Sequence, residues 1–241
     1  MTTRVDEIAD GIFRISTSVP IPAIPGGFTF NQILIQDEAP LLFHTGLRSL
    51  FEATRAAIER VLPVSSLRYL GYSHFEADEC GAMNPFLALA PAAVPLCSQV
   101  SALVSMGDMA DRPPRAMGDG EELDLGRHRI QWLDTPHVPH GWDAGLMWVS
   151  TVRTLLCGDL FTQPGSDLPP ITEGDILGPS EAMLAGMDYY ACRDKARTTL
   201  ARLVELRPDT LATMHGSSFR GDGAALLKAL SVALSEPADV H

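Results

Sequence analysis

The stretch YLGYSHFEADECGAMNPFL, Tyr69 to Leu87, places four side chains that can bind metals directly after a short apolar run. They are His74, Glu76, Asp78 and Glu79. The apolar run predicts a strand that ends near His74, so the acids fall in a loop and the first helical turn beyond it. Acidic residues also favour a helix N-terminus on electrostatic grounds alone. Taken alone, the stretch therefore indicates a metal site and a solvated helix start about equally.

Three later stretches also end an apolar run with a histidine or an aspartate. TPHVPHGWD follows RIQWLD, LLCGD ends at Asp159, and LATMHG contains His215. Side chains at strand ends share one rim of a sheet, which lets ligands that are distant in sequence converge. The sequence therefore predicts a metal site built from several strand ends.

The order of these motifs resembles the metallo-β-lactamase superfamily: H-x-E-x-D, a later His, a Gly-Asp after a strand, and a final His-Gly. Hydrolases of that superfamily usually carry H-x-H-x-D-H, whereas Glu76 stands at the third position, as in the flavodiiron branch. The motifs are specific as a set and span nearly the whole chain. The resemblance implies a single domain over residues 1–241, of α+β or α/β class, folded as a four-layer αββα sandwich.

The resemblance also implies a ligand set for two metal ions. One ion would be held by His74, Glu76 and His140, the other by Asp78 and His215, with Asp159 bridging both. His140 is preferred because HGWD resembles the HWPD of the family, and His137 is the alternative. Glu79 stands where the family commonly has a histidine. The second metal therefore gains a carboxylate, loses a ligand or takes water instead.

Three further histidines receive weaker expectations. His44 lies in LLFHTG, where the superfamily often has an aspartate that orients ligands. It either orients a ligand in the same way or is a satisfied core histidine. His128 and His241 are expected at the surface without a role.

The donor set favours particular metals. Glu76, and Glu79 if it binds, add hard carboxylate oxygens that favour iron or manganese over zinc. The resemblance implies two metal ions, with iron expected and zinc or manganese as alternatives. The predicted function is a non-haem diiron protein that binds or reduces dioxygen or nitric oxide, as an enzyme or as an oxygen sensor. The alternative is a zinc- or manganese-dependent hydrolase acting on a small-molecule substrate.

Composition limits the partners. The formal net charge is −12 and no Lys/Arg-rich run occurs, which argues against nucleic acid and anionic membranes. No segment approaches the roughly 18 apolar residues of a membrane span, and no signal peptide is evident, so a cytoplasmic protein is expected. The four cysteines form no C-x-x-C pair, which disfavours a cysteine metal site.

Flavodiiron proteins carry a flavodoxin-like domain after the diiron domain, and the sequence beyond His215 shows none. Electrons are therefore expected from a separate redox partner protein or chemical donor. A helix capped by Ser180 is predicted to run to about Leu206, and another over residues 80–89. Tyr189 and Tyr190 on the first of these either meet a partner subunit, as in a homodimer, or pack against the sheet.

Overall fold

Fourteen strands form two sheets of seven in the computed structural model, which describes residues 2–185 and 187–235. The first sheet runs in the order β1 to β7, antiparallel from β1 to β4 and parallel from β4 to β7. Its strands are β1 (Thr2–Ala9), β2 (Ile12–Ile21), β3 (Ile24–Ile35), β4 (Leu41–Phe43), β5 (Tyr69–Gly71), β6 (Val94–Ser98) and β7 (Arg115–Met117).

The second sheet has the order β12-β14-β13-β11-β10-β9-β8. Neighbouring β11 and β13 are parallel, so their carboxyl ends lie on one rim. The strands are β8 (Glu122–Asp124), β9 (Arg129–Asp134), β10 (Gly145–Val149), β11 (Thr154–Leu156), β12 (Ile171–Thr172), β13 (Thr210–Ala212) and β14 (Ser218–Arg220).

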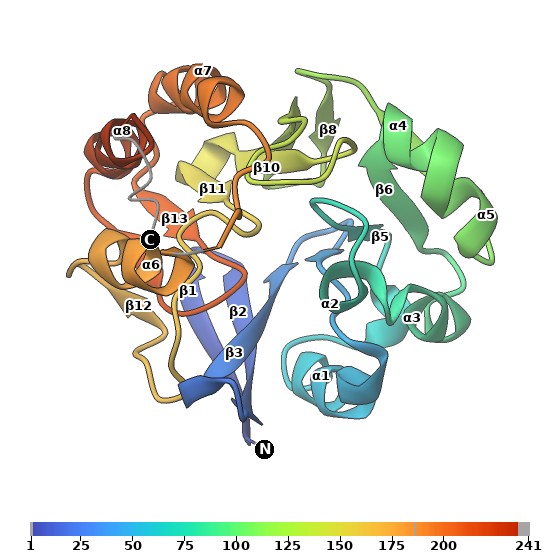
Figure 1. Ribbon diagram of the computed structural model, residues 1–241. Helices are drawn as coiled ribbons and strands as arrows, with labels where there is room; N and C mark the ends of the chain where they lie inside the picture. Colours follow the sequence, from blue (N-terminus) through green and yellow to red (C-terminus); the bar gives the residue numbers. More distant parts are fainter. Residues whose placement is uncertain (1, 186, 236–241) are drawn as a thin grey trace.

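Helices cover the outer face of each sheet. Figure 1 shows α1 to α5 on the right and α6 to α8 on the left, with the strands between them. The right-hand helices are α1 (Phe51–Ile58), α2 (Ala77–Cys80), α3 (Met83–Leu89), α4 (Gln99–Ser101) and α5 (Gly107–Met109), with the π-helical η3 (Ala102–Met106) between the last two. The left-hand helices are α6 (Leu177–Leu184), α7 (Arg193–Val204) and α8 (Gly223–Ala233). Short 3-10 turns are η1 (Arg48–Leu50), η2 (Val64–Ser66) and η4 (Ser150–Val152).

Strand alternation explains the layers. In β3, Ile33 and Ile35 pack into the cluster between the sheets, and Leu34 faces the opposite cluster under α1 and α3. In β10, Met147 joins the central cluster and Trp148 the cluster under α7 and α8. Because successive side chains point to opposite faces, strands apolar on both faces need cover on both. The predicted αββα sandwich is confirmed.

Two helix predictions need correction. The helix predicted from Ser180 to about Leu206 is wrong, because α6 and α7 are separate and Ser180 is buried inside α6. The chain between them crosses toward the rim, where Ala191 N–H donates to Pro139. The helix predicted over 80–89 is split between α2 and α3, because Ala82 N–H donates out of the helix to Gly46.

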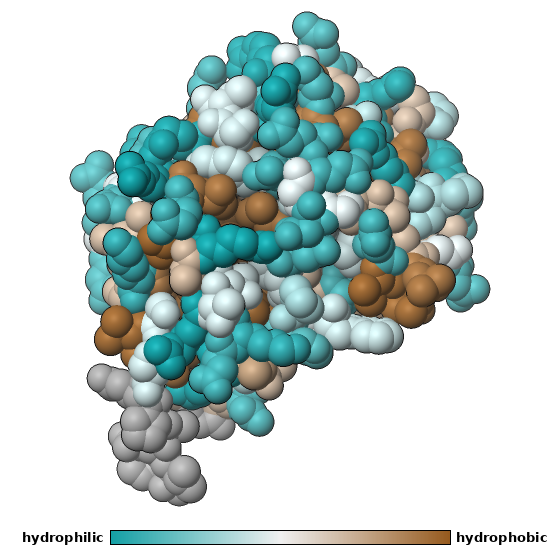
Figure 2. Space-filling view, turned by 90° about the horizontal axis from the view of Figure 1, so that it is seen from above, coloured by the Kyte–Doolittle hydropathy of each residue, from teal (hydrophilic) through white to brown (hydrophobic). Residues whose placement is uncertain are grey.

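One group of exposed apolar side chains lies on α4 and η3. Figure 2 shows hydrophobic atoms gathered at the right, on the side that α4 and α5 occupy in Figure 1. Leu103 of η3 is 84% exposed, and Val100 and Val104 beside it are also exposed. Within residues 2–185 and 187–235, no helix has the length and apolar character needed to cross a bilayer.

Candidate metal centre

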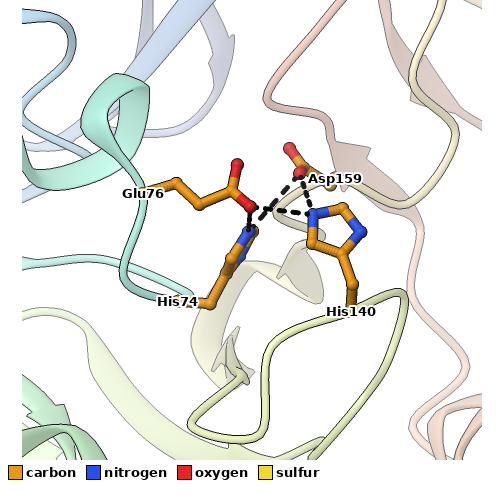
Figure 3. A group of neighbouring side chains, drawn as sticks. All are labelled: His74, Glu76, His140 and Asp159. Carbon is orange, nitrogen blue, oxygen red and sulfur yellow. Dashed lines mark ion pairs between the residues drawn. The ribbon is translucent and has the colours of Figure 1, made fainter. Parts of the chain in front are cut away.

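Four predicted ligands converge at one point between the sheets. One ligand atom from each of His74, Glu76, His140 and Asp159 lies within 4.8 Å of the other three. Figure 3 shows the four side chains pointing toward one another. His140 Nε2 is 3.2 Å from Asp159 Oδ2 and 3.4 Å from Glu76 Oε1. The structure thus brings His140 into the cluster, whereas its alternative His137 is not among the four.

These residues come from loops at strand ends in both sheets. His74 and Glu76 follow β5 of the first sheet, and Asp159 follows β11 of the second. His140 lies in the loop between β9 and β10. The loop after β5 is joined directly to the start of β10, since Gly145 N–H donates to the Ser73 carbonyl. Convergence at the rim is what the sequence predicted from strand ends.

A second group lies on the other side of Asp159. His215 Nε2 is 3.4 Å from Asp159 Oδ1 and 3.4 Å from Asp78 Oδ2. Asp159 Oδ2, in contrast, faces His74 and His140. The two oxygens of one buried carboxylate therefore point into two neighbouring groups of donors, the geometry expected of a bridging ligand.

All three histidines present the same nitrogen to this centre. His215 Nδ1 lies 2.8 Å from the Thr29 carbonyl, and His140 Nδ1 lies 3.3 Å from the Tyr189 carbonyl. A carbonyl oxygen only accepts, so Nδ1 carries the hydrogen in both rings. Nε2 faces the carboxylates, and once the ring is neutral this nitrogen carries the lone pair that a metal ligand needs.

Glu79 is buried but faces away from the second group. Its Oε1 accepts from Ser73 Oγ at 2.5 Å and lies 3.2 Å from His74 Nδ1. Its Oε2 accepts from the backbone N–H groups of Ser73 and His74, at 3.0 Å and 2.7 Å. Its side chain therefore contacts Ser73 and the Nδ1 side of His74, away from the nitrogen that faces the other ligands. This geometry does not support the predicted role of Glu79 as a metal ligand.

The remaining histidines have different surroundings. His44 is buried with Nε2 3.6 Å from Glu79 Oε1, on the side of Glu79 rather than at the ligand cluster. The surface position expected for His128 is wrong: it is buried, with Nδ1 2.7 Å from Asp37 Oδ2 and Nε2 3.0 Å from the Asp10 carbonyl. This pair ties the β8–β9 turn to the turn after β3. His241 lies outside the described residues.

Negative charge raises the proton affinity of the imidazoles. Burial lowers the pKa of His74, but Glu79, Glu76 and Asp159 outweigh it and raise that pKa to about 12. Burial also lowers the pKa of His140 and of His215, and the neighbouring carboxylates again outweigh it. The pKa is raised to about 9 for His140 and to about 10 for His215. The cluster therefore attracts positive charge strongly.

Several supporting residues carried no clear sequence signal. Tyr189 donates from its hydroxyl to the Asp159 carbonyl at 3.2 Å, and its ring stands edge-on to His140 at 4.8 Å. Phe28 stacks on His215 at 4.3 Å. The Tyr189 contacts depend on the break between α6 and α7, and the Thr29 contact on a backbone carbonyl. Neither can be read from residue type.

The donor set fits metal ions. Two buried atoms at the heart of the cluster, His74 Nε2 and Asp159 Oδ1, have no hydrogen-bond partner within the described residues. Ligand atoms on one metal lie about 2 Å from it and therefore within roughly 4 Å of each other, which the 3.2 to 3.7 Å contacts satisfy. In the described chain, the ion-pair partners of these carboxylates are histidines.

Comparison with known proteins identifies the family. A family model described as "ODP family beta lactamase" matches residues 28–216, which include every predicted ligand. The chain belongs to the ODP β-lactamase family. The predicted resemblance to the flavodiiron branch of the metallo-β-lactamase superfamily is confirmed by this match together with the relatives of the ODP chain.

Two relatives and one solved structure illustrate this. Rubredoxin-oxygen oxidoreductase of Megalodesulfovibrio gigas is 27% identical over 214 residues, 82% of the ODP chain and 50% of that protein. A nitric oxide reductase of Moorella thermoacetica is 27% identical over 212 residues, 84% and 52% of the two chains. The flavodiiron protein of Giardia intestinalis shares the fold, with a TM-score of 0.83 at 17% identity over 98% of this chain and 60% of its own. The ODP chain thus spans about half the length of these curated relatives.

Proposed function

We propose that this ODP protein holds two iron ions at the Asp159 rim and binds or reduces dioxygen or nitric oxide there. The observation that carries the proposal is the position of Asp159, whose two oxygens face two separate groups of histidine and carboxylate donors. The names of its relatives, a rubredoxin-oxygen oxidoreductase and a nitric oxide reductase, support the same class of substrate.

The donors support iron rather than zinc. Glu76 provides a carboxylate in the first group, which also contains Asp159, and Asp78 provides one in the second. Hard oxygen donors suit iron and manganese, while imidazole and thiolate ligands predominate in zinc sites. When bound, two iron ions supply the electrons that reduce the gas. The chain's own residues would hold these ions with Nε2 lone pairs and keep each ring in place through Nδ1.

Electrons for this chemistry would come from a separate donor protein. Two aromatic side chains beside the proposed ligands are exposed: Phe75, between His74 and Glu76, by 41%, and Trp142, after Gly141, by 58%. Apolar exposure beside a functional site favours docking of a partner. The name of one relative indicates rubredoxin as the donor for that protein.

Iron content and gas consumption test the proposal together. Protein purified from iron-supplemented cells is expected to contain iron, to show near-ultraviolet absorption that bleaches on reduction, and to consume dioxygen or nitric oxide when reduced chemically. Glu76→Ala should lose metal and gas consumption. Glu173→Ala, which removes an exposed carboxylate that is not among the proposed ligands, should keep both metal and gas consumption. Zinc alone, with ester hydrolysis and no gas consumption, would instead support the metallo-hydrolase.

A further inference from the structure

Glu79 and Asp78 are adjacent in sequence, but their side chains leave α2 in different directions. Successive residues of a helix point about 100° apart, so the two carboxylates cannot face the same way. Asp78 reaches His215, at 3.4 Å between Oδ2 and Nε2. Glu79 turns back under the end of β5, where its side chain is 1% exposed.

The contacts of Glu79 hold it in that orientation. Its two oxygens accept hydrogen bonds from Ser73 Oγ, Ser73 N–H and His74 N–H, and they also face His74 Nδ1 and His44 Nε2. Its own carbonyl accepts from Thr45 N–H at 2.6 Å. Turning the carboxylate toward His215 would break the side-chain contacts and leave buried donors unpaired, which costs about 1–3 kcal/mol for each group.

The two donor groups are consequently unequal. The first contains four residues whose ligand atoms lie within 4.8 Å, namely His74, Glu76, His140 and Asp159. The second contains Asp78, His215 and the other oxygen of Asp159. Because Glu79 faces His74, the second group has one donor fewer. The first group also has a histidine whose outer nitrogen is fixed by a carboxylate, which orients a ligand and increases its basicity.

We propose that this centre binds its two metal ions unequally, tightly beside His74 and weakly beside His215, and that Glu79 is a positioning residue for the tight ion. The inference rests on the proposed dinuclear site. It adds that Glu79, which stands where the family commonly has a metal-binding histidine, orients the ligand His74 instead. Glu79 acts through His74 and does not touch metal.

Anaerobic calorimetric titration of ferrous iron into the metal-free protein tests the inequality. Two binding events are expected, the second weaker by about tenfold or more, the scale on which one orienting contact alone changes metal affinity. After desalting, metal analysis should find close to one iron per chain. Two events of equal affinity would overturn the inference and leave the proposed function standing. Absence of any binding would overturn both.

Two variants assign the events. Glu79→Gln keeps the size of the side chain but removes its charge, and it should weaken the tight event about 10- to 100-fold while leaving the weak event unchanged. Asp78→Ala should remove the weak event and leave the tight one. Loss of the weak event in Glu79→Gln, with the tight one intact, would make Glu79 a ligand of the second metal and overturn the proposal. Circular dichroism checks that the variants fold. Glu79→Asp shortens the side chain but keeps its charge, and it should also weaken the tight binding event.

Discussion

The three imidazoles of the centre share one electrostatic situation. Carboxylates raise the pKa of His74 to about 12, of His140 to about 9 and of His215 to about 10, against an ordinary value of 6.5. These raised pKa values favour protonation of the three rings in the metal-free protein at neutral pH. A metal ligand must present a neutral Nε2, so metal and protons compete for the same atoms.

Metal uptake at neutral pH should therefore release protons. The affinity for metal should rise with pH until the rings are already deprotonated in the metal-free protein. Unperturbed histidines would release fewer protons, roughly one quarter of a proton per ring at pH 7, because they are already mostly neutral. Calorimetric titration in two buffers with different ionisation enthalpies measures the release directly. Identical heats in the two buffers would show that the imidazoles are neutral before metal binds.

At the scale of elements, the rim depends on close contact between two loops. Gly141, in the loop that carries His140, has φ of +77°, and a Cβ built there would lie 3.0 Å from the Cβ of His74. Gly120 has the same φ of +77°, but a Cβ there would have no heavy atom closer than 3.9 Å. The two glycines thus share a backbone conformation and differ in their surroundings.

Gly141→Ala and Gly120→Ala should each destabilise the protein by about 1–2 kcal/mol, because an L-residue is strained at positive φ. Only Gly141→Ala should also weaken metal binding, by displacing the ring of His74. Urea unfolding of the metal-free variants and ferrous iron titration separate the two effects. Equal metal affinity in both variants would mean that the loop contact does not position His74.

Sequence pattern predicted the elements better than the connections. Apolar runs with polar ends placed β3, β5, β11 and β13, and therefore the rim, because strand periodicity is local. The break between α6 and α7 could not be predicted, because apolar residues at helical spacing continue across it. The break is stabilised by tertiary hydrogen bonds of Tyr189 and Ala191. The orientation of the Glu79 side chain could not be predicted from the sequence either. A one-residue step around a helix changes which neighbour a side chain meets, and both choices suit a glutamate.

At the scale of the whole molecule, the centre joins the two halves of the sandwich. His74, Glu76 and Asp78 belong to the half with the first sheet, and His140, Asp159 and His215 to the half with the second. Metal bound between them would stabilise the folded chain, since the unfolded chain does not bring these ligands together.

Ferrous iron at about 100 times the dissociation constant of the tight site should add about 2.7 kcal/mol to the free energy of unfolding through that site alone. This increase should raise the Tm by roughly 5–10 °C for a chain of this size. Anaerobic differential scanning fluorimetry with and without a chelator measures the shift. Asp159→Ala should abolish it, because that carboxylate contributes to both groups. A Tm unaffected by metal in the wild-type protein would exclude preferential binding of the metal to the folded chain.

The position of the metals is the most direct measurement of the central claim. Crystals of protein loaded with excess ferrous iron should give two anomalous-difference peaks at the iron absorption edge, one beside each carboxylate oxygen of Asp159. The peak on the side of His74 should be the stronger if occupancy follows the donor count. No iron peak at Asp159, or a signal at the zinc edge alone, would contradict the account.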